Sequence, residues 1–311
     1  MKHTSDPHPH KRHSMVVRAL WVAAAVALVL VLIGGALDLL DLRVRQTVRL
    51  SKAYAFTGST VRIQGIGNGT VLIEAGSPGA VTMSSAITEG IRRATLTATA
   101  SGDTFNLRSS GCNDYVSLGW YGTCDIHVTL RVPAGVSVTA AEDNTNITIQ
   151  GVNGNHHIQV GNGNVTLQHV HSENLFLSTD NSDLTLVDVS TNSLQTSTNN
   201  GKITMDTVRA ATLTTRADNG DISARTLTAA SVTATTANGK MTLQFAAPPA
   251  SLTARSDNGD VSVRLPHDAT SYKTAVHSDD GQATVNIRTD PENTHNTISA
   301  TSHNGNVTLG Y

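Results

Sequence analysis

Three aromatic side chains and two cysteines gather in one short segment, CNDYVSLGWYGTC, in a chain whose aromatic content is only 4%. The residues concerned are Cys112, Tyr115, Trp120, Tyr121 and Cys124. A disulfide between the cysteines would restrict the unfolded loop, which is worth about 3 kcal/mol for this loop length. Large rigid side chains on a constrained loop suit contact with a partner or a glycan. The segment is the best candidate binding site, and the alternative is that it caps one end of the fold.

Acidic and histidine side chains raise the question of a metal. The sequence DNGD occurs at 218–221 and 257–260, and oxygen-rich turns can bind calcium. No single turn supplies enough ligands, so turn-forming residues are the simpler interpretation. Two groups of histidines could each hold a transition metal if their side chains faced one another. The first group is His3, His8, His10 and His13, and the second is His156, His157, His169 and His171. Scattered surface histidines are the favoured interpretation of both groups. We expect no metal site and no cofactor.

Catalysis and nucleic-acid binding are both disfavoured. No Ser-His-Asp set, carboxylate pair or phosphate loop stands out at a usable spacing, and the positions that should face solvent are mostly Thr and Ser. Residues 141–311 contain 9 Lys or Arg and 16 Asp or Glu, a net charge of −7 that would repel phosphates. The sequence therefore predicts a protein that is not an enzyme and does not bind nucleic acid.

The elements that must position these residues are set by a repeat. An Asn-Gly pair, or a close variant of it, recurs nine times between residues 144 and 305 at spacings of 18 to 24 residues. Two and four positions after each anchor stand apolar residues, with only Thr or Ser between them. This alternation is typical of strands, and a second apolar strand precedes each turn.

A fixed period near 19 residues predicts a β-solenoid, similar to a parallel β-helix, in which each coil stacks on the next. The alternative is an antiparallel meander in which each Asn-Gly is a two-residue hairpin turn. We expect the Asn or Gly at each corner to adopt the left-handed backbone conformation. The repeat-corner residues are Asn162, Gly163, Asn200, Gly201, Asn219, Gly220, Asn238, Gly239, Asn258, Gly259, Asn304 and Gly305.

The N-terminal part divides into three segments. Residues 1–18 are basic and His-rich and are expected to form a disordered cytoplasmic tail. Residues 19–40 are expected to form a transmembrane helix, because Ala19–Leu37 carries no charge and would span about 28 Å as a helix. A cleavable signal peptide is the rival, although this apolar run is long for one. Residues 41–140 are expected to hold a stalk, at 41–55, and an irregular β part with the disulfide loop; residues 141–311 form the solenoid.

The orientation follows from the cysteines and from the size of the polar region. Basic residues flank both ends of the apolar run almost equally, so the positive-inside rule is close to a tie. Long polar domains translocate largely regardless of flanking charge, and a disulfide forms outside the cytoplasm. We expect a single-pass cell-membrane protein with a cytoplasmic N-terminus and an extracytoplasmic C-terminal domain.

The order HVTLRVPAGVSVTA, then EDNTNITIQGV, then successive Asn-Gly strand units resembles the bacterial putative-adhesin family of β-strand repeats, which is formally of unknown function. The resemblance covers about residues 60–311. It implies a β-helical domain of the cell envelope, often behind one membrane helix, with a binding or structural role. It assigns no catalytic residue, and the segment between Cys112 and Cys124 departs from the pattern.

Two functions remain open. The first is an adhesin-like binding module that meets an envelope component, a polysaccharide or a protein. The second is a structural or self-associating spacer, or an accessory protein of envelope stress. The chain ends on TSHNGNVTLGY with no obvious cap, and an open strand edge invites pairing with another chain. Homo-association through this C-terminal edge would be lost on adding charge at Val307 or Leu309.

Overall fold

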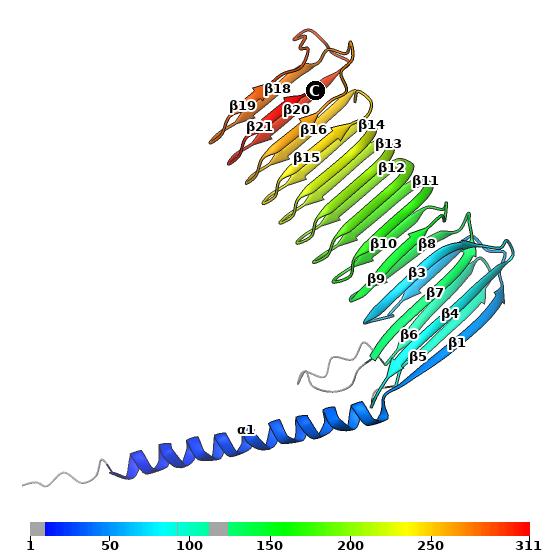
Figure 1. Cartoon of the computed structure of the whole chain (residues 1–311), viewed down its shortest axis with the longest axis vertical. Helices are drawn as coiled ribbons and strands as arrows, with labels where there is room; N and C mark the ends of the chain where they lie inside the picture. Colours follow the sequence, from blue (N-terminus) through cyan, green and yellow to red (C-terminus); the bar gives the residue numbers. More distant parts are fainter. Residues whose placement is uncertain (1–9, 92, 112–123) are drawn as a thin grey trace, which may run out of the picture.

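The computed structural model describes residues 10–91, 93–111 and 124–311. One helix, α1 (His10–Val44), leads into strands that wind up as a solenoid (Figure 1). The strands are β1 (Gln46–Ala55), β2 (Thr60–Gln64), β3 (Gly69–Gly76), β4 (Ala80–Glu89), β5 (Thr95–Ser101), β6 (Thr104–Ser110), β7 (Cys124–Pro133), β8 (Ser137–Glu142), β9 (Thr145–Gln150), β10 (His156–Val160), β11 (Val165–Thr179), β12 (Leu184–Thr198), β13 (Ile203–Ala217), β14 (Ile222–Thr236), β15 (Met241–Phe245), β16 (Ser251–Ser256), β17 (Val261–Arg264), β18 (Lys273–Ser278), β19 (Ala283–Val285), β20 (Thr297–Ser302) and β21 (Val307–Gly310).

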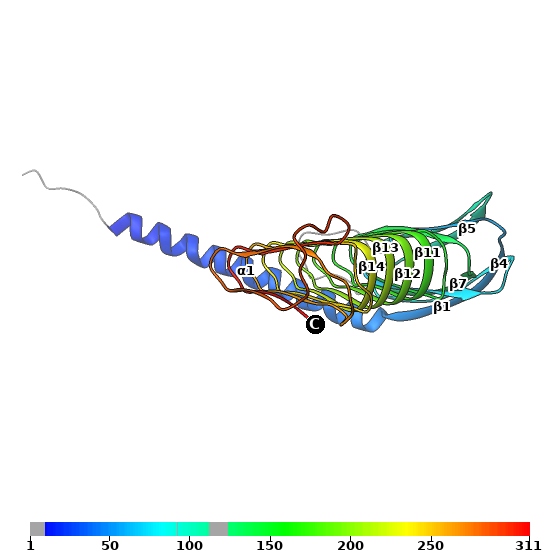
Figure 2. The ribbon, with the colours of Figure 1, turned by 90° about the horizontal axis from the view of Figure 1, so that it is seen from above.

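Neighbouring coils pair in parallel and in register, as the repeat predicts. Leu184 on β12 pairs with Ile203 on β13, which pairs with Ile222 on β14. From above, the coils lie behind one another in two layers (Figure 2). The fold is therefore the predicted β-solenoid, and the antiparallel meander is excluded for residues 137–310.

The apolar positions of the repeat form one continuous core between the two layers. Along β12 and β13 the burial alternates, so that Leu184, Leu186, Ile203 and Met205 are buried while the Thr residues between them are partly exposed. Each fully buried Leu or Ile contributes about 1.5–3 kcal/mol relative to an exposed one. No single coil encloses these side chains, so stacking is what removes them from water.

The left-handed residues lie at the bend opposite the Asn-Gly corners, which corrects the expectation from the sequence. Positive φ values occur at His169, Asp188, Thr207 and Thr226, between 53° and 56° and 19 residues apart. None of the Asn-Gly corners has a positive φ. At this bend a continuous strand such as β13 changes direction at one residue with a left-handed backbone conformation. That conformation is energetically unfavourable for a β-branched residue such as Thr.

Glycine is needed at the Asn-Gly corners for a different reason, which is the closeness of the coils. A Cβ atom on Gly220 would overlap the carbonyl oxygen of Gly201 in the preceding coil, and one on Gly239 would overlap that of Gly220. The same overlap recurs at Gly163, Gly201, Gly259 and Gly305. The absent side chain therefore permits stacking rather than an unusual dihedral angle.

Both ends of the solenoid depart from the sequence order of the coils. At the C-terminal end, β20 and β21 lie between the coil of β16 and β17 and the coil of β18 and β19. At the other end, β2 and β3 lie between β6 and β7 and the coil of β8 and β9. The expected open edge at β21 is therefore wrong, because β21 is paired on both sides and the terminal edge belongs to β18 and β19.

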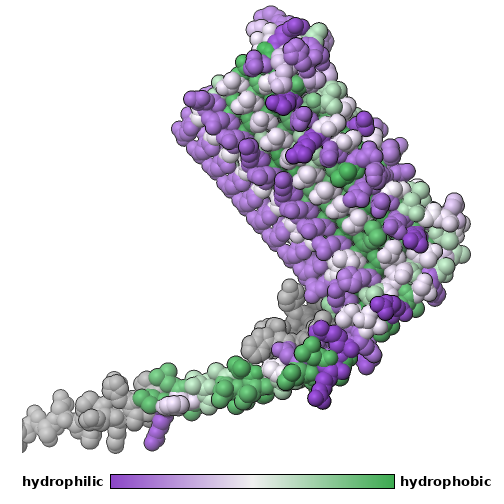
Figure 3. All heavy atoms as spheres, viewed as in Figure 1, coloured by the Kyte–Doolittle hydropathy of each residue, from purple (hydrophilic) through white to green (hydrophobic). Residues whose placement is uncertain are grey.

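The segment expected to be a stalk is part of the sheet. Residues 46–55 form β1, which pairs antiparallel with β4 along its whole length. The helix also begins at His10, so residues 10–18 belong to α1 rather than to a disordered tail. Its segment Val17–Val44 is long and apolar enough to cross a membrane, a property shared by membrane anchors and signal sequences. Figure 3 shows this apolar surface against the mostly polar solenoid.

Candidate functional site

The aromatic loop lies outside the described residues. Cys112, Tyr115, Trp120 and Tyr121 fall within 112–123, so their binding role and the disulfide stay predictions. Cys124 is the first residue of β7 and is 9% exposed, opposite Glu89 on β4. The loop therefore leaves and rejoins the β structure at the end nearer to α1.

The Asn-Gly corners form a polar ridge along one edge of the solenoid (Figure 3), here called the Asn-Gly ridge. Each corner asparagine donates from Nδ2 to Oδ1 of the asparagine one coil earlier, over 2.6–3.0 Å. The ladder runs through Asn144, Asn162, Asn181, Asn200, Asn219, Asn238, Asn258 and Asn304. Because these amides are bonded to one another, the ladder stabilises the stack along its length.

A second column of the ridge carries charges of alternating sign. Successive coils place Asp183, Lys202, Asp221, Lys240 and Asp260 above one another. The Asp side chains also accept backbone N–H groups from the next coil, as Asp183 does from Lys202 and Asp221 from Lys240, both at 2.8 Å. Each of the three inner charges therefore lies between two opposite charges, which supports a structural role.

The acidic turns singled out for calcium are engaged by neighbouring side chains. Asp218 pairs with Arg216 at 2.6 Å, and Asp257 pairs with Arg255 at 2.7 Å. Asp279 lies between His277, at 2.7 Å, and His303, and hydrogen bonds from His303 and then His277 hold the pKa of that carboxyl below its usual value. In the described part of the chain, no group of three His, Cys, Asp or Glu side chains is arranged to hold a metal ion.

The four mid-chain histidines have separate surroundings. His156 is buried, where its Nδ1 accepts the N–H of Val138 at 3.2 Å and its Nε2 donates to the carbonyl of Val152 at 2.9 Å. Burial lowers the pKa of His156 to about 4, so the ring is neutral at pH 7. His157 stacks on Phe176, with ring centroids 4.5 Å apart, and His169 pairs with Asp188 at 2.9 Å.

A buried carboxyl group near the N-terminal end escaped the sequence analysis. One oxygen of Glu142 accepts the N–H of Ile66 at 2.8 Å and the hydroxyl of Thr145 at 3.3 Å, while its other oxygen has no partner among the described residues. Desolvation raises the pKa of Glu142 to about 7 despite these hydrogen bonds. Glu142 fixes the loop between β2 and β3 to the coil that β8 begins, and nothing in its local sequence signals that contact.

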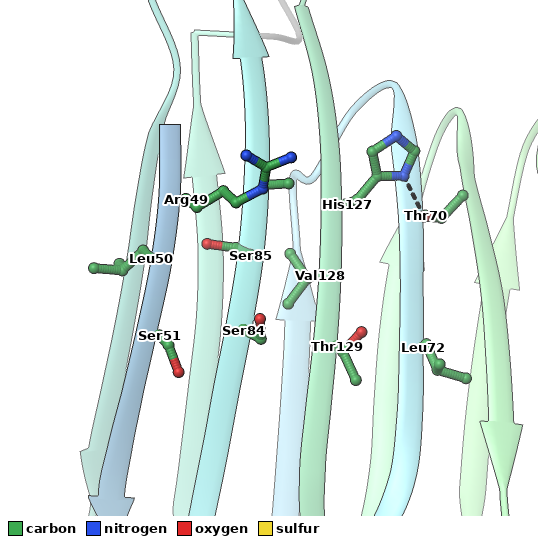
Figure 4. Close-up of a pocket in the computed structure, with 11 residues that line it drawn as sticks. Arg49, Leu50, Ser51, Thr70, Leu72, Ser84, Ser85, His127, Val128 and Thr129 are labelled. Carbon is green, nitrogen blue, oxygen red and sulfur yellow. Dashed lines mark hydrogen bonds between the residues drawn. The ribbon is translucent and has the colours of Figure 1, made fainter. Parts of the chain in front are cut away.

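A groove of 540 Å³ opens on the outer surface of β1, β4, β7 and β3 (Figure 4), and β1 is the strand that directly follows α1. Arg49 and Ser51 line it from β1, and His127 and Thr129 line it from β7. The sequence could not reveal it, because the groove depends on antiparallel pairing of β4 with both β1 and β7, outside the repeat. It is the candidate site that the described structure adds to the aromatic loop.

Comparison with known proteins gives one family and several distant structures. The sequence profile of the Toastrack DUF4097 family matches residues 67–309. A "putative adhesin" from Parabacteroides merdae is 12% identical with a TM-score of 0.43, and the match covers 85% of this chain and 96% of that one. A "putative adhesin" from Bacteroides fragilis is 14% identical with a TM-score of 0.37 and the same coverage.

A "putative lipid binding protein" from Parabacteroides distasonis is 13% identical with a TM-score of 0.32, over 85% of this chain and 96% of that one. No curated protein matches the chain. The family profile spans the repeat and most of the irregular β region, from the loop before β3 to the penultimate residues of β21. The chain therefore belongs to the Toastrack DUF4097 family.

Proposed function

We propose that the chain is a membrane-anchored, non-catalytic binding module of the bacterial cell envelope. In this proposal α1 is an uncleaved anchor with its N-terminus in the cytoplasm, and the solenoid lies outside the membrane. The partner is an envelope component, a polysaccharide or another protein, contacted in part by Tyr115, Trp120 and Tyr121. A disulfide between Cys112 and Cys124 would constrain their loop.

The observation that carries the proposal is the junction between helix and solenoid. Only one residue separates the end of α1 at Val44 from the start of β1 at Gln46. Asp41, 4% exposed, accepts the N–H of Ile91 at 2.8 Å and lies against Gly90 at the end of β4. A helix fixed in this way would hold the solenoid at a set height and tilt above a membrane, which suits the display of a binding surface.

The test uses the full chain in nanodiscs, titrated against isolated cell envelope. Saturable binding that the double variant Trp120→Ala, Tyr121→Ala removes would support a recognition module and locate its site. The matched control is Phe176→Ala, which removes an aromatic ring from the solenoid surface where it stacks on His157. Equal binding by all three proteins would contradict the role of the loop, and no binding by any of them would contradict the module itself.

Topology has its own test in whole cells. A C-terminal tag should be removed by protease added to intact cells whose outer layers are permeable to it, while an N-terminal tag should survive until the membrane is opened. The opposite pattern, or a free ectodomain lacking residues 1–36, would contradict an uncleaved anchor with this orientation.

The second candidate is a spacer or self-associating element. The strand edge available for self-association is the one formed by β18 and β19 rather than β21, and Val285 on this edge is 41% exposed. Concentration-dependent dimers lost in Val285→Asp would favour this function over the first. A monomer at every concentration, in detergent and in nanodiscs, would exclude it.

A further inference from the structure

The groove beside α1 has a floor of small side chains between two polar walls. Ser84 and Ala86 on β4 form the floor, since β4 lies between β1 and β7 in the sheet. In register, Arg49 pairs with Ala86, which pairs with His127. With strands about 4.8 Å apart, the backbones of Arg49 and His127 lie about 10 Å apart across Ala86.

The Arg49 guanidinium extends over β4 toward the side on which His127 lies (Figure 4). Three other arginines of this region pair with carboxylates: Arg45 with Asp41, Arg93 with Glu89, and Arg131 with Glu74. No acidic side chain in the described structure lies within 4 Å of the Arg49 guanidinium. Arg49 therefore offers a set of N–H donors to the groove.

The opposite wall is held in place by its own hydrogen bonds. His127 Nδ1 lies 2.7 Å from the Thr70 hydroxyl, and Nε2 lies 2.9 Å from Asp125. These two contacts hold the ring in place, so His127 forms a fixed wall of the groove and Arg49 is its principal cation. Hydroxyl groups of Ser51, Ser84 and Thr129 line the next row of the groove and can donate from three different strands.

We propose that this groove binds a phosphate ester, with Arg49 as its principal contact. A guanidinium donates two parallel hydrogen bonds to a phosphate, and hydroxyl groups on three strands can surround the remaining oxygens of a tetrahedral anion. A planar carboxylate would use fewer of these donors. The inference rests on the proposed extracytoplasmic binding role for its setting, and it adds a ligand class and a site separate from the aromatic loop.

The position of the groove leaves two sources for the phosphate. Arg49 is the fourth residue of β1 and the fifth after Val44, so it lies about 16 Å along the chain from the end of α1. The helical segment Val17–Val44 is about 42 Å long, which is comparable to the thickness of a bilayer including its headgroups. The groove would then lie at or just above the headgroups, within reach of an anionic lipid or of a phosphate-bearing envelope polymer.

The experiment measures binding of the full chain, in neutral detergent, to two probes. The first is soluble glycerol phosphate and its short polymer, and the second is nanodiscs of phosphatidylglycerol compared with nanodiscs of phosphatidylcholine. Arg49→Gln should weaken binding about 10- to 100-fold, since it removes a charge-assisted bidentate contact. Ser84→Leu fills the floor without changing charge and should weaken binding to a similar degree.

Lys52→Gln is the matched control. Lys52 lies on the same strand and carries the same charge, but it pairs with the buried Met83 and lies over the Tyr54 ring, on the other face of β1. If binding depended only on general electrostatic attraction, the two variants would lose affinity equally. If the phosphate binds in the groove, affinity should fall at least tenfold in Arg49→Gln and threefold or less in Lys52→Gln.

The outcomes separate the sources and the proposals. If soluble glycerol phosphate binds and both Arg49→Gln and Ser84→Leu weaken that binding, the ligand is a phosphate-bearing polymer. If only phosphatidylglycerol nanodiscs bind and both variants weaken that binding, the ligand is a lipid headgroup. Absence of binding to both probes, or equal loss in Lys52→Gln, overturns the groove. Envelope binding that survives Arg49→Gln while the probes fail would leave the proposed function standing and the groove excluded.

Discussion

At the Asn-Gly corners, one methyl group decides whether two coils can stack. The corner glycines have ordinary backbone angles, yet each lies against a carbonyl oxygen of the neighbouring coil. The opposite bend has room for side chains but needs positive φ, and there the chain uses His169, Asp188, Thr207 and Thr226. The two bends of one coil therefore restrict the sequence in different ways, by space at one and by dihedral angle at the other.

Replacing Gly220 with Ala should destabilise the solenoid. The added Cβ overlaps the carbonyl of Gly201, a backbone atom that cannot move without disturbing the ladder, so we expect a loss of about 2–3 kcal/mol. The measurement is the urea midpoint of the full chain in detergent. Gly135→Ala is the control, because a Cβ there meets no atom within 4 Å and should change stability little. Similar midpoints for both variants would refute the close-contact explanation.

The residue types at the Asn-Gly corners suggest a left-handed turn, whereas the structure shows a close approach of two backbones. Asn and Gly are common both in left-handed turns and in places of close backbone approach, so their types alone cannot separate the two causes. Thr207 and Thr226 carry no signal of a left-handed bend, since Thr favours strands. Their left-handed conformation is imposed by the path of the coil, which must change direction at one residue within each long strand.

At the scale of single elements, two buried titratable groups in neighbouring coils respond to pH in opposite directions. Glu142 ends β8, and His156 begins β10, which pairs with β8. The pKa of His156 is lowered from 6.5 to about 4, so its contribution to stability is present above pH 6.5 and is lost as the pH falls toward 4. The pKa of Glu142 is raised from 4.5 to about 7, so the fold is penalised as the pH rises through that window.

Glu142→Gln should remove the penalty that the carboxyl imposes above pH 7. Below pH 4.5 the carboxyl is protonated in the folded and unfolded states, so the variant gains nothing there. Between pH 4.5 and 7 the unfolded state ionises first, and the variant should gain up to about 3 kcal/mol relative to the parent by pH 8. Urea unfolding of both proteins at pH 4 and pH 8 measures this. A stability difference that does not change with pH would show that Glu142 is not desolvated.

For the whole molecule, the period of the repeat is readable from the sequence, but the order of the coils is not. Val261, Val307 and Ala283 occupy equivalent positions, and each would fit beside either of the others. The longer spacings before residues 281 and 305 indicate irregular connections without saying which coil is outermost. The groove beside α1 was equally hidden, because it depends on antiparallel strands that follow no repeat.

Charge at Val307 and at Val285 should have different effects. Val307 is fully buried in β21, between β17 and β19, so Val307→Asp places an unpaired carboxylate in the core and should unfold the last three coils. Val285→Asp lies on the terminal edge and should leave the coils intact. Limited proteolysis followed by mass analysis distinguishes them. Early cleavage C-terminal to β16 is expected only in Val307→Asp, and comparable cleavage in both variants would contradict this coil order.

The inserted coil also determines how the rod would respond to tension. In a solenoid whose coils follow the sequence, a load on the C-terminus peels away the outermost coil, one backbone bond after another. Here Tyr311 follows β21, which is held by β17 on one edge and by β19 on the other. A pull on Tyr311 therefore shears two rows of backbone hydrogen bonds at once. A rod fixed at its other end to a membrane would bear load at its tip without unravelling from the last residue.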